Sequence, residues 1–266
     1  MADFTHNNRK AWEQAFDKRS VDFDRETIEL LKHEPASLFS PALREMLHRL
    51  GAKGGALAQF CCNNGRETLA ALSFGFDRAA GYDIARNMIE SATRMAESLT
   101  LPATFEACDL LTLKPGHGAP FDVGLLTVGA LCWFKDLNPV FKNIAACLKD
   151  GATLVIEDMH PACNMLVETD DPLYNLEHPA KMVHDYFKTS PWLSNDGMGY
   201  MTDDAYVSHT FESYSHTWSS LINGLVDAGF VIKRIEENTV DQSNLFSHLD
   251  NQGIPLTYLL EARLRR

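Results

Sequence analysis

The chain has 266 residues, of which 45% are apolar and 23% are charged. This composition is typical of globular proteins and argues against a disordered or fibrous chain. The length suffices for one large domain, or for a domain that carries an insertion. The 24 basic and 36 acidic side chains give a net charge of −12, which disfavours nucleic acid as a partner because phosphate repels an acidic surface.

Targeting and redox features predict a cytoplasmic protein. No apolar run approaches the roughly 20 residues that a membrane helix requires. The polar segment 1–10 lacks the apolar stretch of a signal peptide. The six cysteines show neither a C-x-x-C pair nor a cysteine–histidine spacing typical of zinc sites. We therefore expect reduced thiols, no bound metal and no membrane partner.

Residues 1–50 are expected to form an N-terminal helical cap. Segment 8–18 carries apolar side chains four residues apart, Trp12 among them, as on one face of a helix. Segment 41–50 has the pattern of a second amphipathic helix, which begins with proline and is followed by glycine.

Residues 51–160 alternate between short apolar runs and amphipathic segments. The residues expected in strands are 56–60, 79–83, 103–108, 121–127 and 153–159. Those expected in helices are 65–74, 86–99 and 138–148, and a turn is expected at 149–151. This alternation predicts strand–helix–strand units and a parallel sheet that is covered on both faces.

Residues 161–216 interrupt the alternation and lack a clean period. A compact domain rarely keeps so long an irregular stretch unless it forms a lid or a binding insertion, so we interpret this segment as an inserted substrate lid. Residues 217–266 then complete the core, with a helix at 218–228 and strands at 230–236 and 254–262. The predicted fold is α/β: a doubly wound, mostly parallel sheet of seven strands, with an antiparallel last strand.

A cofactor site is expected where the first two strands end, because ligands of an open parallel sheet bind beyond the carboxyl ends of its strands. Gly65 follows the first strand in a turn that would allow a ligand to approach the backbone closely. Asp83 closes the second strand. A carboxylate at this position can accept hydrogen bonds from two ribose hydroxyls.

The order of these features resembles the class I S-adenosylmethionine (SAM)-dependent methyltransferases. The glycine-rich loop of that family corresponds to residues 59–65, its ribose-binding acid to Asp83 and the acid near its adenine to Asp109. The family's fourth, fifth and sixth strands correspond to residues 121–127, 151–157 and 229–232. The resemblance implies the doubly wound fold of that family.

The loop departs from the family pattern at three positions. Gln59 stands where the family usually has an acid, and Cys61 and Asn63 stand where it usually has glycines. Asparagine tolerates positive φ better than most residues, so Asn63 can replace a glycine sterically, whereas Cys61 does so less easily. The loop also lacks the G-x-G-x-x-G fingerprint, which argues against a nicotinamide cofactor.

The resemblance implies SAM as the cofactor and S-adenosylhomocysteine (SAH) as the product. The residues that it assigns to the cofactor are Phe60, Cys61, Asn63, Gly65, Asp83, Ile84, Asp109, Leu110, Thr127, Val128, Gly129 and, from the N-terminal cap, Trp12. Several alternatives stay open: a solvated strand end for Asp83, a helix cap or turn for Asp109, a plain loop for 127–129, a buried small hydrophobe for Cys61 and core packing for Trp12.

The acceptor is expected to be a small molecule bound under the lid. The aromatic residues expected to contact it are Trp133, Phe134, Tyr186, Trp192 and Tyr200. Their alternative role is to pack in the core or to hold the lid together. His160 and His216 are the candidate catalytic bases, because an imidazole titrates near neutral pH.

The expected function is transfer of a methyl group from SAM to an oxygen or nitrogen atom of a small molecule. The altered glycines keep open a catalytically inactive SAM-binding regulator or scaffold. A local basic face would keep open an RNA methyltransferase. A homodimer is compatible with both the lid and the sheet edges.

Overall fold

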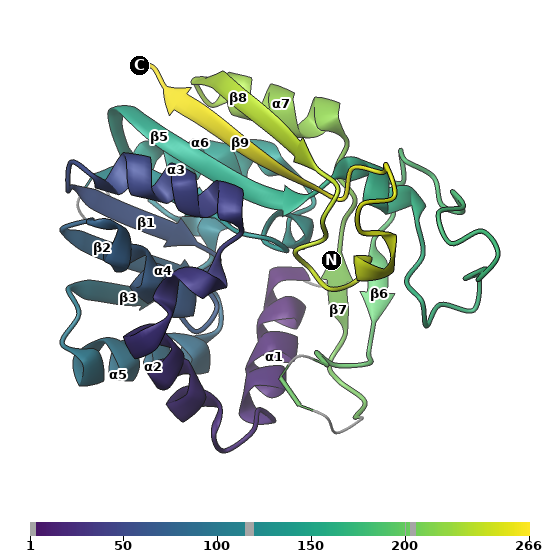
Figure 1. Cartoon of the computed structure of the whole chain (residues 1–266), viewed down its shortest axis with the longest axis horizontal. Coiled ribbons are helices and arrows are strands. Elements are labelled where there is room, and N and C mark those ends of the chain that lie inside the picture. The colour runs from purple at the N-terminus through teal and green to yellow at the C-terminus, as the bar shows by residue number, and fades with distance from the viewer. Residues whose placement is uncertain (1–3, 115–119, 200, 203–205) are drawn as a thin grey trace.

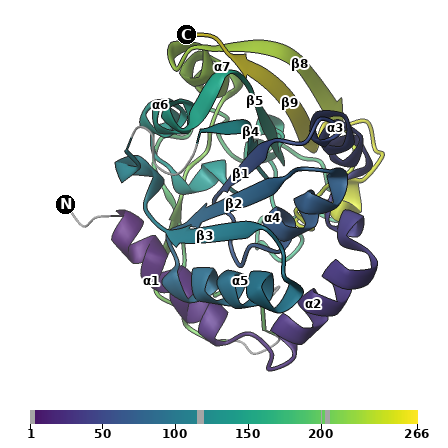
Figure 2. The same ribbon diagram turned by 90° about the vertical axis from the view of Figure 1, so that its left-hand side faces the viewer.

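The computed structural model describes residues 4–114, 120–199, 201–202 and 206–266. Within these residues, seven strands form one sheet in the order β3-β2-β1-β4-β5-β9-β8, with helices on both faces (Figures 1 and 2). Strands β1 to β5 run parallel to one another, and β9 is antiparallel to both β5 and β8. This confirms the prediction of a doubly wound sheet with an antiparallel last strand.

The strands of the sheet are β1 (Ala56–Phe60), β2 (Arg78–Asp83), β3 (Ala103–Ala107), β4 (Phe121–Leu126), β5 (Leu148–Met159), β8 (Phe230–Asn238) and β9 (Thr257–Leu264). The α-helices are α1 (Phe4–Asp17), α2 (Phe23–His33), α3 (Pro41–Gly51), α4 (Arg66–Ala71), α5 (Arg86–Leu99), α6 (Leu137–Cys147) and α7 (Trp218–Asp227). Short 3-10 helices are η1 (Pro35–Leu38), η2 (Leu72–Phe74), η3 (Leu110–Thr112), η4 (Leu131–Trp133), η5 (Pro161–Met165) and η6 (Ser247–Leu249). Among the described helices, none has the length and apolar character to cross a membrane.

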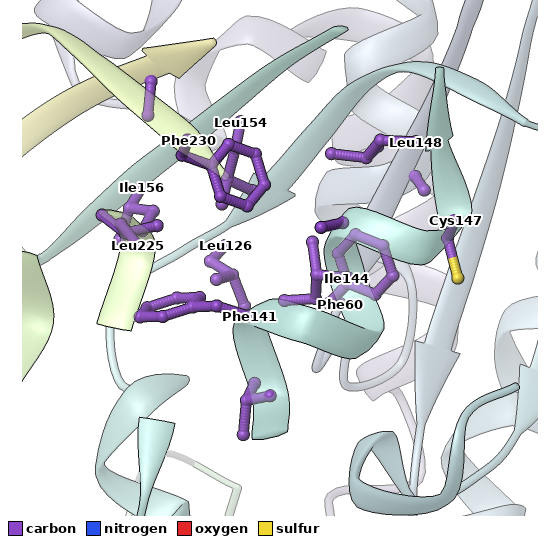
Figure 3. Close-up of a cluster of buried hydrophobic side chains, with 14 of the residues drawn as sticks. Phe60, Leu126, Phe141, Ile144, Cys147, Leu148, Leu154, Ile156, Leu225 and Phe230 are labelled. Carbon is purple, nitrogen blue, oxygen red and sulfur yellow. The ribbon is translucent and has the colours of Figure 1, made fainter. Parts of the chain in front are cut away.

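Alternate side chains of the buried strands supply the core on the two faces of the sheet. On one face, Phe60 of β1 and Leu126 of β4 pack with Phe141 of α6 and Leu225 of α7 (Figure 3). On the other face, side chains of β1, β4 and β5 pack against α3, α4 and α5. Burial of each such large apolar side chain stabilises the fold by about 1.5–3 kcal/mol. The carboxyl ends of β1, β2, β4 and β5 are thereby fixed along one edge.

Two local predictions are corrected by the structure. The turn expected at 149–151 lies inside β5, which begins at Leu148 and pairs with β4 on both sides of a register shift. Gly151, with φ of +73°, lies within this irregularity, so the strand bends without ending. The helix expected at 65–74 is divided into α4 and η2, and Gly65 precedes it as the N-cap residue.

The N-terminal helix α1 and the segment 161–216 lie together at the carboxyl edge of the parallel strands (Figure 1). Within that segment, β6 (Trp192–Ser194) and β7 (Phe211–Ser213) form a small antiparallel sheet. The Asn8 side chain of α1 donates from Nδ2 to the carbonyl of Glu212 (2.8 Å) and accepts the Glu212 N–H at Oδ1 (2.8 Å). Helix α1 also packs against α5 (Figure 2). The two segments that cover this edge therefore contact each other directly.

Candidate active site

The loop after β1, residues 61–65, contains three residues with positive φ. Cys61, Asn63 and Gly65 all have left-handed conformations, with φ of +57°, +52° and +75°. Asn63 thus takes the place of a glycine, and Cys61 does so as well despite its less favourable side chain. Left-handed backbone at a non-glycine residue costs about 1–3 kcal/mol and is found preferentially at functional sites.

Asp83, at the end of β2, holds this loop in place. Its Oδ2 accepts the N–H of Asn63 (2.8 Å), and its Oδ1 accepts the N–H of Ala85 (3.0 Å). Burial raises the pKa of Asp83 to about 6, although the backbone donors favour the charged form. Each carboxylate oxygen can accept more than one hydrogen bond, so the half-buried Asp83 retains capacity for a ligand. The residue predicted to bind ribose therefore also organises the loop.

The two glycines at the ends of the loops after β1 and β4 differ in their surroundings. A Cβ at Gly65 would lie 2.5 Å from Cε1 of Phe105 and 2.7 Å from Cβ of Ala92, so this position has no room for a side chain. A Cβ at Gly129, beyond β4, would meet no atom within 4 Å. The side-chain nitrogen Nδ2 of Asn64 is buried and has no hydrogen-bond partner among the described residues. These features suit a loop whose remaining hydrogen bonds are completed by a bound nucleoside.

Four other residues were expected to bind the adenosine part of the cofactor, and the structure places some of them at the sheet edge and others in the core. Asp109 follows β3 and accepts the N–H of Leu111 at Oδ1 (2.8 Å), so it caps η3 as in the alternative interpretation. Ile84 is half-buried beside Asp83. The Phe60 and Leu110 side chains are 0% and 3% exposed in the core. A ligand at this edge would therefore contact these two residues through their backbone atoms.

Asp158, which was not predicted to be a site residue, holds the loop after β4 in place. Asp158 of β5 accepts the N–H of Gly129 at Oδ1 (2.9 Å) and the N–H of Leu131 at Oδ2 (3.3 Å). Burial raises its pKa to about 6. It thereby fixes the segment Thr127–Gly129 that was predicted to contact the cofactor. An acid that ends an otherwise apolar strand was the sequence signal for this role.

A second missed feature is a polar network between β1, β4 and α4. Gln59 Nε2 donates to Glu67 Oε2 (2.8 Å) and to Thr127 Oγ1 (3.1 Å), and Gln59 Oε1 accepts from Thr68 Oγ1 (2.6 Å). Thr127 Oγ1 donates to the same oxygen of Glu67 (2.6 Å). The family's acidic position therefore holds a buried amide, and a carboxylate reaches it from the following helix.

Another buried carboxyl lies on the same side of the sheet. Glu157 of β5 accepts a short hydrogen bond from Oγ of Ser40, the residue that caps α3. Burial raises the pKa of Glu157 to about 7, against the effect of Ser40, and the charge of Glu67 adds to the rise. Glu157 therefore connects α3 to the cofactor edge of the sheet.

Three aromatic residues from distant segments meet above this edge. Trp12 of α1 lies edge-on to Trp133 of η4 (centroids 5.2 Å apart) and to Phe211 of β7 (5.4 Å). They pack with Ala85, which follows the loop-anchoring Asp83 by two residues. The structure thus brings Trp12 and Trp133 together, whereas the neighbouring Phe134 side chain is buried in the core.

The side chains of two predicted lid aromatics are hydrogen-bonded to other parts of the protein. The hydroxyl of Tyr186 accepts the N–H of Trp218 at the start of α7 (3.0 Å). Trp192 Nε1 donates to Oγ of Ser215 (2.9 Å). Trp192 therefore holds the lid together, as in the alternative interpretation, whereas Tyr186 joins the lid to α7. Tyr200 lies outside the described residues.

His160 has no ring nitrogen left for an acceptor. Its Nδ1 accepts the N–H of Ala162 (3.0 Å), and its Nε2 lies 2.8 Å from Oε1 of Glu237 and 3.1 Å from Nε1 of Trp218. Burial lowers its pKa, while Glu237 opposes the shift. This geometry argues against the predicted role of His160 as a base, because a base needs a free lone pair that faces the acceptor.

His216 differs from His160 in its free ring nitrogen. Its Nε2 donates to the carbonyls of Phe134 (2.9 Å) and Leu131 (3.2 Å), which places the proton on Nε2 and leaves a lone pair on Nδ1. Burial lowers its pKa, which favours the neutral form. His216 lines a cavity of about 360 Å³ between the start of α6 and one side of α7. Of the two histidines, only this one combines an available lone pair with adjacent space.

Comparison with known proteins agrees with this geometry. Residues 58–151 match the family model of a methyltransferase domain. No protein in a comparison with curated proteins matches the chain.

Solved structures share the fold. A Listeria monocytogenes protein is 18% identical, with a TM-score of 0.60 over 84% of this chain and 97% of that one. A SAM-dependent methyltransferase of Mesorhizobium loti is 19% identical, with a TM-score of 0.55 over 88% and 99%. Magnesium protoporphyrin IX methyltransferase of Synechocystis PCC 6803, solved with bound SAH, is 16% identical, with a TM-score of 0.53 over 98% and 100%. At these identities the likeness is one of fold.

The match identifies residues 58–151 as a methyltransferase domain, and the fold around them is shared with SAM-dependent methyltransferases. A methyltransferase domain is an enzymatic domain, and the solved structures that share its fold include SAM-dependent methyltransferases.

Proposed function

We propose that the protein transfers the methyl group of SAM to an oxygen or nitrogen atom of a small molecule and releases SAH. The observation that carries the proposal is the position of Asp83 against the left-handed loop 61–65. There its carboxylate can accept ribose hydroxyls while the loop backbone faces the rest of the nucleoside. Asp109 and the segment 127–129 would bind the adenine and methionine parts.

The protein contributes orientation more than chemical activation. Bound SAM supplies a methyl group on a sulfonium, which is already electrophilic. The residues of the site must then hold the acceptor atom in line at about 3–3.5 Å from that carbon. Asp83 and Asp158 contribute to this alignment indirectly, because they fix the two loops that would bind the cofactor.

The covering of the edge supports a small acceptor. Helix α1 and β7 are joined through Asn8, and their aromatic side chains pack together above the site. Such a cover excludes water and leaves little access for a polymer. The net charge of −12 also disfavours RNA. We assign the base, where the acceptor needs one, to His216 through Nδ1, and the nearby cavity to acceptor entry.

Calorimetry with SAH tests the cofactor site. Loss of a charged hydrogen-bond partner costs about 1.5–3 kcal/mol, so Asp83→Ala is expected to weaken SAH at least tenfold. A 2′,3′-dideoxy analogue of SAH should bind the wild type and the variant alike. The matched control is Asp122→Asn, because Asp122 accepts the N–H of Ala56 at the opposite edge of the sheet. Equal SAH affinity in wild type and Asp83→Ala would refute the ribose role.

Release of SAH from SAM tests the acceptor class. Small-molecule alcohols, phenols and amines are compared with RNA as acceptors, and turnover is expected only with small molecules. SAM binding without turnover on any of them would favour the inactive regulator. Once an acceptor is found, unchanged turnover of His216→Ala would remove this residue as the base. The homodimer and the cytoplasmic location stay predictions, testable by light scattering and cell fractionation.

A further inference from the structure

The carboxylate of Glu67 is an unexplained charge at the cofactor edge. Glu67 lies in the first turn of α4, and its Oε2 accepts hydrogen bonds from Gln59 (2.8 Å) and Thr127 (2.6 Å). Gln59 is itself held by Thr68, and both are almost fully buried, at 1% and 0% exposed. The carboxylate is therefore fixed between the ends of β1 and β4.

The hydrogen-bond partners of Glu67 carry no charge. Amide and hydroxyl donors orient a carboxylate but do not neutralise it. None of the ion pairs formed within the described ranges includes Glu67. A half-buried, oriented and unpaired anion is costly to maintain, and a cationic ligand would compensate it.

The network also joins Glu67 to the residues that face the cofactor. Thr127 begins the segment that ends at Gly129, where a Cβ would meet open space. The loop 61–65 separates Gln59 from α4, so Glu67 follows directly on the backbone that we assign to the nucleoside. If Asp83 holds the ribose of SAM, the ends of β1 and β4 are where Gln59, Glu67 and Thr127 could meet its methionine part.

We propose that Glu67 binds the α-ammonium group of SAM and SAH, and that Gln59 and Thr127 orient its carboxylate for this contact. The inference rests on the proposed cofactor site and assigns one of its polar contacts to the helix that follows the loop. The strand end itself then needs no acid, because Gln59 acts as a neutral support.

The test compares three ligands by calorimetry: SAH, its analogue with hydrogen in place of the α-amino group, and 5′-methylthioadenosine, which lacks the whole amino-acid end. The wild type is expected to prefer SAH to the des-amino analogue at least tenfold. In Glu67→Gln, SAH is expected to weaken at least tenfold and to bind no better than the analogue. Binding of 5′-methylthioadenosine should stay within twofold, which shows that the nucleoside site is intact.

The matched control is Glu45→Gln, which removes the same charge from the exposed face of α3 and should bind all three ligands as the wild type does. Equal weakening of SAH and the des-amino analogue in Glu67→Gln would assign Glu67 a structural role and overturn the proposal. If Glu67→Gln does not fold, Glu67→Asp keeps the charge and should retain a preference for SAH above threefold; loss of that preference also counts against it. A wild type that binds none of the three ligands would instead refute the cofactor site.

Discussion

A single methyl group should distinguish the two glycines that flank the site. Gly65 and Gly129 both have left-handed backbone, with φ of +75° and +84°. In alanine variants this conformation costs about 1–2 kcal/mol, and the reduced freedom of the unfolded chain offsets about 0.4–1 kcal/mol. The backbone change alone should therefore destabilise either variant by about 1 kcal/mol.

Only Gly65 adds a steric clash to this backbone cost. Its Cβ would lie 2.5 Å from Phe105 and 2.7 Å from Ala92, whereas at Gly129 it would meet open space. Overpacking of this kind costs about 1–3 kcal/mol. Gly65→Ala should thus lower the free energy of unfolding by about 2–4 kcal/mol and Gly129→Ala by about 1 kcal/mol.

Urea unfolding followed by circular dichroism measures the difference between the two variants, provided that the slope with denaturant is unchanged. Equal shifts of the midpoint in Gly65→Ala and Gly129→Ala would refute the close packing of Phe105 and Ala92 around Gly65.

Two further predictions concern the acids of the core and the link between cap and lid. Burial raises the folded-state pKa of Glu157 to about 7, so the stability that its protonated form provides is complete below about pH 4.5 and is lost as the pH rises through 7. The free energy of unfolding of Glu157→Gln should therefore exceed that of the wild type by up to about 3 kcal/mol at pH 8, and the two should be equal at pH 4. Asp122→Asn should show the opposite trend, since the pKa of Asp122 is lowered, and a pH-independent difference for Glu157→Gln in thermal unfolding would contradict the assignment. Asn8→Ala leaves the N–H and C=O of Glu212 unpaired, at a cost of about 2 kcal/mol, and should raise hydrogen exchange in α1 and β7 together; Asn7→Ala is the neighbouring control, and faster exchange in α1 alone would disprove the coupling.

The sequence by itself determined the order of strands and helices in the core. Period and length separate buried strands from amphipathic helices wherever one face of an element is buried, and this holds from β1 to β5. It also located Asp83 at the end of the second strand and Gly65 in the turn after the first strand, at the edge of the sheet where ligands bind. Its errors were local: the turn expected at 149–151 failed because strand pairing absorbs an irregularity around Gly151 without ending the strand.

The tertiary structure alone decided which polar side chains act together. The hydrogen bonds that Gly129 donates to Asp158 and Thr127 donates to Glu67 join residues far apart in the chain, and no spacing rule predicts them. The two histidines looked equivalent in the sequence, yet only the fold engages both ring nitrogens of His160 and leaves one of His216 open. The physical reason is that local periodicity depends on neighbours along the chain, whereas hydrogen-bond partners and desolvation depend on which strand ends the sheet brings side by side.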